Sequence, residues 1–141
     1  MIIFNELYWP DGISHTTIPS TWIEKVINDN GKLVGRIDFV FCHDDYLLHI
    51  NKTFLNHDYY TDIITFNHSE NDHYISGDIF ISLDRVRDNA GQMNSIFHHE
   101  LERIVIHGVL HLLGYNDSSE SEKILMRAKE DICLRLLHVT N

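Results

Sequence analysis

Two histidines four positions apart stand out in the stretch HGVLHLLGYND, which covers residues 107–117. In a helix, His107 and His111 lie one turn apart on the same face, so both imidazoles can reach one metal ion. Gly114 can adopt a left-handed conformation and turn the chain back, which brings Asp117 towards the same point. Two nitrogens and one carboxylate oxygen leave a fourth position open to water, as in catalytic zinc sites. The spacing therefore predicts a metal centre at His107, His111 and Asp117.

The expected ion is a single Zn²⁺, because imidazole with one carboxylate suits zinc, although nickel or another divalent ion fits the same donors. Zinc can lower the pKa of bound water to about 7, which makes a nucleophile for hydrolysis of a peptide bond or a phosphodiester. The alternative is that His107 and His111 are core histidines bonded to carbonyl groups, and that Asp117 caps the next helix. Chelating spacing, a glycine break and a carboxylate in register together favour the metal centre.

The residue after the first histidine separates the two hydrolytic chemistries. Zinc peptidases with this ligand spacing carry a glutamate there as the general base. In this chain the position is Gly108, which cannot move a proton. The peptidase interpretation therefore lacks its key group, and we expect the glycine to leave room beside His107.

The ligands need a rigid support, which the surrounding apolar pattern supplies. Residues 96–113 are apolar over most of a helical circumference, which predicts a central buried helix that carries the histidines. Strands are expected at four stretches: 2–7, 36–42, 61–66 and 74–83. Further helices are expected at 19–30, 45–55, 83–93 and from Ser118 or Ser119 to about His138.

The order of these elements predicts an α+β fold in a single domain of residues 1–141. We expect a mixed sheet of about four strands packed with four or five helices, in which 61–66 and 74–83 form an antiparallel hairpin with a long connection. Asp44 and Asp45 are expected to cap the helix that follows them.

Composition limits the possible partners. The formal charge is −10, which argues against a broad electrostatic grip on DNA or on an anionic membrane but leaves room for a small local RNA site. No run of eighteen apolar residues and no secretory signal are recognisable. Cys42 and Cys133 are expected to be free thiols in a reducing cytoplasm.

Three stretches carry a resemblance to a known family. HGVLHLLGYND resembles the signature of the YbeY family, H-G-x-L-H-L-x-G-Y-D-H. TDIITF at 61–66 is similar to the family's T-(D/N)-V-L-S-F, and GDIFIS at 77–82 is similar to its G-D-I-x-I-(S/C). Met126 and Glu130 also resemble family positions, so the matches span residues 61–130, about half of the chain.

The resemblance implies a zinc-dependent endoribonuclease that acts on single-stranded ribosomal RNA or its precursor. It also implies roles in maturation of the 3′ end of the small-subunit RNA and in ribosome quality control, with a ribosomal particle or assembly proteins as partners. His107 and His111 match the first two metal ligands, and Asp117 stands where the family has a third histidine. Its negative charge should make the bound water less acidic than a site of three histidines would. Leu55 occupies the place of an arginine that contacts RNA in many members.

Two charged residues near the predicted centre have competing interpretations. Arg103 lies one turn before His107, so it is a candidate phosphate contact, and the alternative is an ion pair with Glu100. Asp78 is a candidate for orienting a histidine ligand through a hydrogen bond, and the alternative is an ordinary edge residue.

Three aromatic residues precede the strand at 61–66. His57, Tyr59 and Tyr60 either stack unpaired bases or belong to a plain solvent-facing loop. For the protein as a whole, two alternatives to the endoribonuclease stay open. These are a zinc peptidase and a noncatalytic ribosome-assembly factor whose metal only braces the fold.

Overall fold

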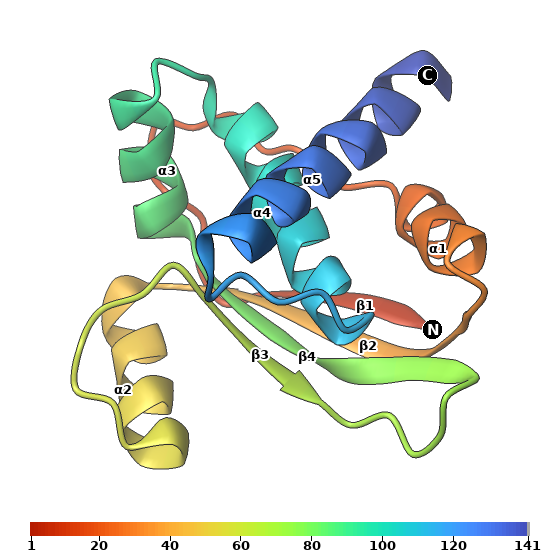
Figure 1. Cartoon of the computed structure of the whole chain (residues 1–141). Helices are drawn as coiled ribbons and strands as arrows, with labels where there is room; N and C mark the ends of the chain where they lie inside the picture. Colours follow the sequence, from red (N-terminus) through yellow and green to blue (C-terminus); the bar gives the residue numbers. More distant parts are fainter. Residues whose placement is uncertain (141) are drawn as a thin grey trace.

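Four strands form one mixed sheet, which the computed structural model describes within residues 1–140 (Figure 1). In order across the sheet they are β1 (Ile2–Glu6), β2 (Leu33–Cys42), β4 (Tyr74–Ser82) and β3 (Ile63–Asn67). β1, β2 and β4 run parallel, and β3 pairs antiparallel with β4. The predicted mixed sheet and the predicted hairpin are both confirmed.

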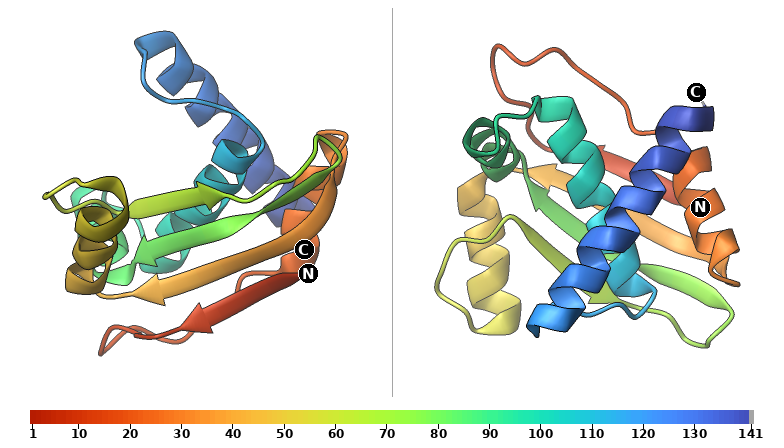
Figure 2. Two further views of the ribbon diagram at one scale, coloured as in Figure 1. Left: turned by 90° about the horizontal axis from the view of Figure 1, so that it is seen from below. Right: turned by 45° about the horizontal axis from the view of Figure 1, so that its top comes forward.

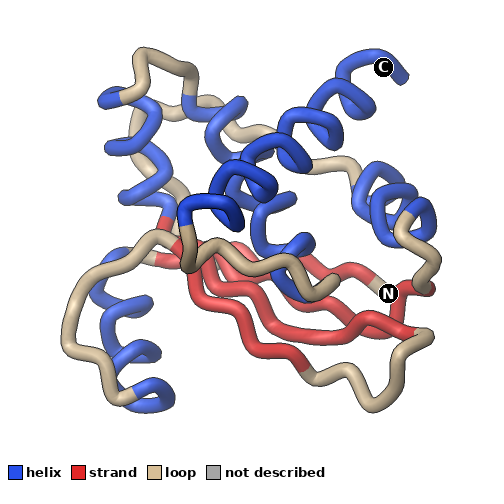
Figure 3. The backbone as a smooth tube through the Cα atoms, viewed as in Figure 1, coloured by secondary structure: helices blue, strands red, loops and turns tan. Residues whose placement is uncertain are grey.

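Five helices accompany the sheet in the described residues. They are α1 (Ser20–Asp29), α2 (Asp44–Leu55), α3 (Leu83–Gln92), α4 (Phe97–Leu112) and α5 (Glu120–Thr140). Figures 1 and 2 show α1, α3, α4 and α5 on one side of the sheet, with α4 between the sheet and α5, and α2 on the other side. Coloured by element type, the chain shows one sheet flanked unequally by helices (Figure 3), which confirms the predicted α+β class.

The period of two along the strands explains this unequal arrangement. On β4, Ile75, Ile79 and Ile81 point into the main core beneath α4, whereas Phe80 points to the opposite face. Phe80 and Phe66 contact each other edge to face there, with ring centroids 5.9 Å apart, in the small cluster that α2 covers. The sheet is therefore apolar on both faces, and the larger core lies on the side of α4.

α4 is the central buried helix that the sequence predicts. Leu101, Val105, Val109 and other apolar side chains of α4 are inaccessible to solvent. Gly108 faces the sheet, where a Cβ atom on it would lie 2.9 Å from Cγ2 of Ile79 and 3.0 Å from Cδ1 of Ile63. The expectation that this glycine makes room beside His107 is wrong, because the space it leaves is filled by the strands.

Some predicted element boundaries are also wrong. β2 begins at Leu33, not at 36, because a bulge after Val34 interrupts the alternation while the strand stays paired with β4. α2 has His43 as its N-cap, and Asp44 is the first helical residue. Its carboxylate instead accepts hydrogen bonds from Ser82 and Arg85.

The predicted cap of the last helix is confirmed. The Ser119 hydroxyl accepts a hydrogen bond from the Glu122 amide at 3.1 Å, and the Glu122 carboxylate accepts one from the Ser119 amide at 2.9 Å. This reciprocal capping box fixes where α5 begins. Cys42 and Cys133 are free, as expected, and both are buried. Each helix within residues 1–140 is too short or too polar to cross a membrane.

Candidate metal centre

The turn after α4 places the third predicted ligand. Gly114 has a φ of 104°, in the left-handed region that favours glycine. Its amide donates to the carbonyl of His111, and the Tyr115 amide donates to the carbonyl of Leu110, both at 3.0 Å. This is the Schellman arrangement of a helix end, which reverses the chain direction. Asp117 consequently lies beside the histidines of the last two turns of α4.

The three predicted ligands converge on one point. Nε2 of His107 lies 3.0 Å from Nε2 of His111, and each of these nitrogens lies 3.3 Å from Oδ2 of Asp117. Ligands about 2.0–2.1 Å from a tetrahedral zinc ion lie about 3.3 Å from one another. The donor set and its spacing therefore fit a zinc ion, and all three side chains are partly exposed, so solvent can reach the group.

A buried carboxylate on α5 orients the first histidine. Nδ1 of His107 donates to Oε2 of Glu130 at 2.7 Å, which leaves Nε2 turned towards Asp117. Burial acts to lower the pKa of His107, but the hydrogen bond and charge of Glu130 and the charge of Asp117 hold it above its ordinary value. Burial acts to raise the pKa of Glu130, and the hydrogen bonds from His107 and Arg103 hold it below its usual range.

A cleft of about 200 Å³ opens beside His107, and charged residues make up most of its lining. They are Asp62, Glu100, Arg103, Arg127 and Glu130, with Ile104 as the apolar member. Burial is the largest influence on two of these carboxyl groups, and it raises the pKa of Asp62 and of Glu100. Two carboxyl groups that hold a proton more readily than usual therefore lie in the same cleft as a candidate ligand.

Arg103 lies in this cleft, but its partners differ from the prediction. One guanidinium nitrogen lies 2.8 Å from Oε1 of Glu130, and the other lies 2.9 Å from Oδ1 of Asp131. The expected ion pair with Glu100 is therefore wrong, because α5 packs across α4 and supplies two closer carboxylates. Arg127, on α5, is more exposed, and its nearest described carboxylate oxygen is Oε1 of Glu130 at 3.9 Å.

Asp78 does not take part in the centre. Its carboxylate pairs with His68 at 2.9 Å, on the part of β4 that faces away from α4. The prediction that Asp78 orients a ligand is wrong, since Glu130 takes that role for His107. Glu130 was recognisable only by its resemblance to a family position, because no local pattern in α5 indicates what lies opposite it.

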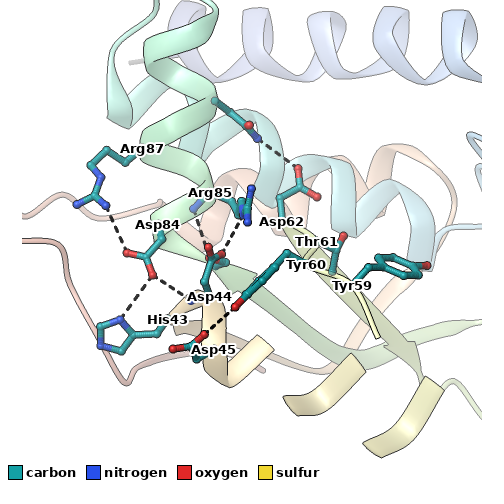
Figure 4. Close-up of polar contacts among 12 residues, drawn as sticks. His43, Asp44, Asp45, Tyr59, Tyr60, Thr61, Asp62, Asp84, Arg85 and Arg87 are labelled. Atoms are coloured by element: carbon teal, nitrogen blue, oxygen red, sulfur yellow. Dashed lines mark hydrogen bonds and ion pairs between the residues drawn. The ribbon is translucent and has the colours of Figure 1, made fainter. Parts of the chain in front are cut away.

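The two tyrosines before β3 are exposed, but each contacts another side chain of the protein (Figure 4). The Tyr60 hydroxyl donates to Asp45 at 3.1 Å, and the Arg85 guanidinium lies 5.1 Å from the centre of the Tyr60 ring. Tyr59 stacks against His57 with ring centroids 5.1 Å apart. Figure 4 shows Asp62 on the same segment, next to Thr61 and directly before β3. Leu55, predicted to stand at the place of the family's arginine, is the last residue of α2 and is 38% exposed.

Comparison with known proteins leads to the same family as the three sequence motifs. The sequence profile of the family described as Endoribonuclease YbeY matches residues 13–138, which is most of the chain.

The chain belongs to the YbeY family.

Curated YbeY relatives are similar over nearly their whole length. Endoribonuclease YbeY of Flavobacterium psychrophilum is 50% identical over 118 residues, which cover 84% of each chain. The YbeY protein of Karelsulcia muelleri is 44% identical over 135 residues, which cover 96% of this chain and 88% of the relative. A protein of Thermotoga maritima with a known solution structure has the same fold, with a TM-score of 0.61 at 24% identity over 99% of this chain and 93% of its own. The predicted family and fold are therefore confirmed.

Proposed function

We propose that this YbeY-family protein is a zinc-dependent endoribonuclease that cleaves single-stranded ribosomal RNA or its precursor. The proposal includes maturation of the 3′ end of the small-subunit RNA, ribosome quality control and a cytoplasmic site of action. The observation that carries it is the convergence of His107, His111 and Asp117 in a chain whose relatives bear the name Endoribonuclease YbeY. The name supports the substrate class, and the donor group supports the chemistry.

The ligand group supplies one metal position with solvent access. When bound there, zinc would act as a Lewis acid towards a phosphate oxygen and would bring the pKa of water close to 7. Glu130 holds the ring of His107 in one orientation and favours the proton on Nδ1, so that Nε2 can act as a ligand. Asp117 contributes a negative charge that partly offsets the charge of the ion.

The cleft beside His107 supplies the phosphate contacts. Arg103 and Arg127 both line it, and guanidinium groups bind phosphate oxygens well. Two carboxylates already hold Arg103, so it is fixed in position with little freedom to follow the substrate. Arg127 is 51% exposed and has only a long contact to Glu130, so it is the more available of the two.

Two carboxyl groups are placed to hold or move a proton. Asp62 and Glu100 line the same cleft, and burial raises the pKa of each. A carboxyl group with a raised pKa can be protonated and deprotonated nearer to neutral pH than an ordinary one. We assign proton transfer during cleavage to this pair, which the sequence alone does not indicate.

The charge of the chain bears on how RNA reaches the cleft. With a formal charge of −10, long-range attraction of RNA is unfavourable. Recognition therefore depends on the local arginines and on docking against a ribosomal particle or an assembly protein. Fast cleavage of ribosomal particles and slow cleavage of free RNA of the same sequence are the expected signature.

The proposal is tested with metal-stripped protein and a single-stranded RNA that covers the small-subunit 3′ end. Zinc should restore cleavage to the wild type and to His68→Ala, a control that removes an exposed histidine with a carboxylate partner. His111→Ala and Asp117→Ala should no longer bind zinc at this centre. Their cleavage rates should fall at least 100-fold. If zinc-loaded protein binds ribosomal precursors but never cuts RNA, the noncatalytic alternative holds and the proposal is wrong.

The peptidase alternative gains no support from α4. Position 108, where a zinc peptidase carries its general base, packs against Ile63 and Ile79 of the sheet. A side chain there would point into the core, away from the donor group. Zinc-loaded protein should therefore leave casein intact under conditions in which it cleaves RNA.

A further inference from the structure

A second group of potential metal ligands lies where the start of α4 meets the end of α5. His99 and Glu102 come from the first turns of α4, and His138 comes from the last turn of α5. One donor atom from each lies within 4.8 Å of the other two, and Nε2 of His138 is 3.2 Å from Oε1 of Glu102. His99 and His107 are eight residues apart on α4, so the two groups are separated by about 12 Å along the helix axis.

The carboxylate at the centre of this group is buried without a strong partner. Glu102 is 3% exposed, and no donor among the side chains that the structure describes makes a hydrogen bond to its Oε1. Its other oxygen lies 3.1 Å from Nε2 of His98. The ion-pair partners of Glu102 in the described residues are thus two histidines, and neither an arginine nor a lysine pairs with it. A buried carboxylate that lacks a permanent cation is costly, and a bound cation would remove that cost.

We propose that His99, Glu102 and His138 bind a divalent transition-metal ion, with Zn²⁺ as the ion of first choice. Two imidazole nitrogens and one carboxylate oxygen form a donor set that zinc accepts readily. His99 and His138 are exposed, so their rings can rotate to shorten the present separations without disturbing the core. The site is independent of the proposed nuclease function, since none of its ligands lies in the candidate metal centre.

The nearby positive charges do not oppose a cation at this point. Arg103 and Arg127 line the hollow beside His99 and His138. Glu130 and Asp131 already neutralise Arg103, however, and Glu100 adds another carboxylate to the same hollow. The balance of charge around Glu102 therefore still favours a divalent ion.

The ion would add a second polar link between α4 and α5, which Arg103 and His107 already connect through Glu130. His138 lies near the end of α5, so a ligand bond there would tie the last turn of α5 to the first turns of α4. A ligand that binds only the folded state stabilises it by mass action. Zinc in excess of the first site should therefore raise the midpoint of thermal unfolding.

The number of zinc ions bound per chain tests the proposal. Metal-stripped full-length wild type, His99→Ala, His138→Ala and the control His68→Ala are titrated with zinc in competition with a coloured chelator. We expect His99→Ala and His138→Ala to bind one zinc fewer than wild type and His68→Ala. If all four bind the same number, the second site does not exist. Circular dichroism checks that the exposed substitutions leave the fold intact.

Two further readouts keep this result separate from the first metal centre. The added thermal stabilisation in excess zinc should disappear in His138→Ala and persist in His68→Ala, and its persistence in His138→Ala would overturn the proposal. In a His111→Ala background, substitution of His138 should still remove one zinc. That loss would support the second site even if the chain cut no RNA.

Discussion

Oε2 of Glu130 lies 2.7 Å from Nδ1 of His107, so a residue on α5 fixes the orientation of an imidazole on α4. The other oxygen of the same carboxylate accepts a hydrogen bond from Arg103 at 2.8 Å. Glu130 is almost completely buried, so water competes weakly for either contact. The candidate centre therefore depends on how α5 packs across α4, in addition to the spacing of the histidines along α4.

Glu130→Gln should lower zinc affinity by about 10–100-fold, because glutamine carries no charge to stabilise the Nδ1 proton while Nε2 binds the metal. Competition with a zinc chelator measures the change. Asp131→Asn is the matched control, since it removes the other carboxylate partner of Arg103 without contact to His107. Equal zinc affinity in wild type and Glu130→Gln would show that Glu130 does not position the ligand.

Arg127→Ala should weaken RNA binding alone, whereas Arg103→Ala should weaken both RNA cleavage and zinc binding. Loss of a phosphate contact raises KM for RNA, so Arg127→Ala should raise KM about tenfold and leave zinc affinity unchanged. Arg103→Ala also frees one oxygen of Glu130, so it should lower RNA cleavage and zinc affinity together. Lys129→Ala, on the same helix, is the control. Unchanged cleavage in Arg103→Ala would refute the role of Arg103 in the cleft.

The sequence predicts the ligand group because its geometry is local. His107 and His111 are related by one helical turn, and Gly114 determines the chain reversal that brings Asp117 back. The four strands and five helices can also be predicted from the sequence, since each has a recognisable hydrophobic periodicity or capping residue. Interruptions such as the bulge after Val34 shift the boundaries by a few residues.

The surroundings of the ligands are long-range features and could not be predicted. Glu130 is 23 residues from His107, and Asp131 is 28 residues from Arg103, so no periodicity relates them. The sequence therefore pairs Arg103 with Glu100, which is nearer along the chain. The sequence offers Asp78 as a partner for a histidine ligand, but its carboxylate projects from the face of β4 away from α4 and pairs with His68.

Gly108→Ala should destabilise the protein, although alanine is the better helix former. The added Cβ would lie 2.9–3.0 Å from Ile79 and Ile63, and overpacking of this kind costs about 1–3 kcal/mol, more than the gain of about 1 kcal/mol in helix propensity. Gly91→Ala on α3 is the control, because its Cβ meets open space, and it should stabilise by about 0.5–1 kcal/mol. Chemical denaturation measures both. Equal stabilisation by the two substitutions would contradict the helix–sheet contact.

Glu100→Gln should stabilise the metal-free protein at neutral pH while slowing RNA cleavage. Burial raises the pKa of Glu100 above its ordinary value of 4.5, so the folded protein binds this proton more tightly than the unfolded chain does. Stability contributed by Glu100 is therefore present below pH 4.5 and is lost as the pH rises from 4.5 through the raised pKa. Glutamine has no charge to bury, so the variant should avoid that loss.

Urea denaturation of wild type and Glu100→Gln at a series of pH values between 3 and 8 tests this, with the exposed Glu24→Gln as the control. The two curves should coincide well below pH 4.5 and diverge above it, with Glu100→Gln the more stable protein. If Glu100 also transfers a proton, zinc-loaded Glu100→Gln should cleave RNA about 100-fold more slowly. If the variant is more stable at pH 7 but cleaves at the wild-type rate, Glu100 affects only stability through its buried charge. Proton transfer would then belong to Asp62.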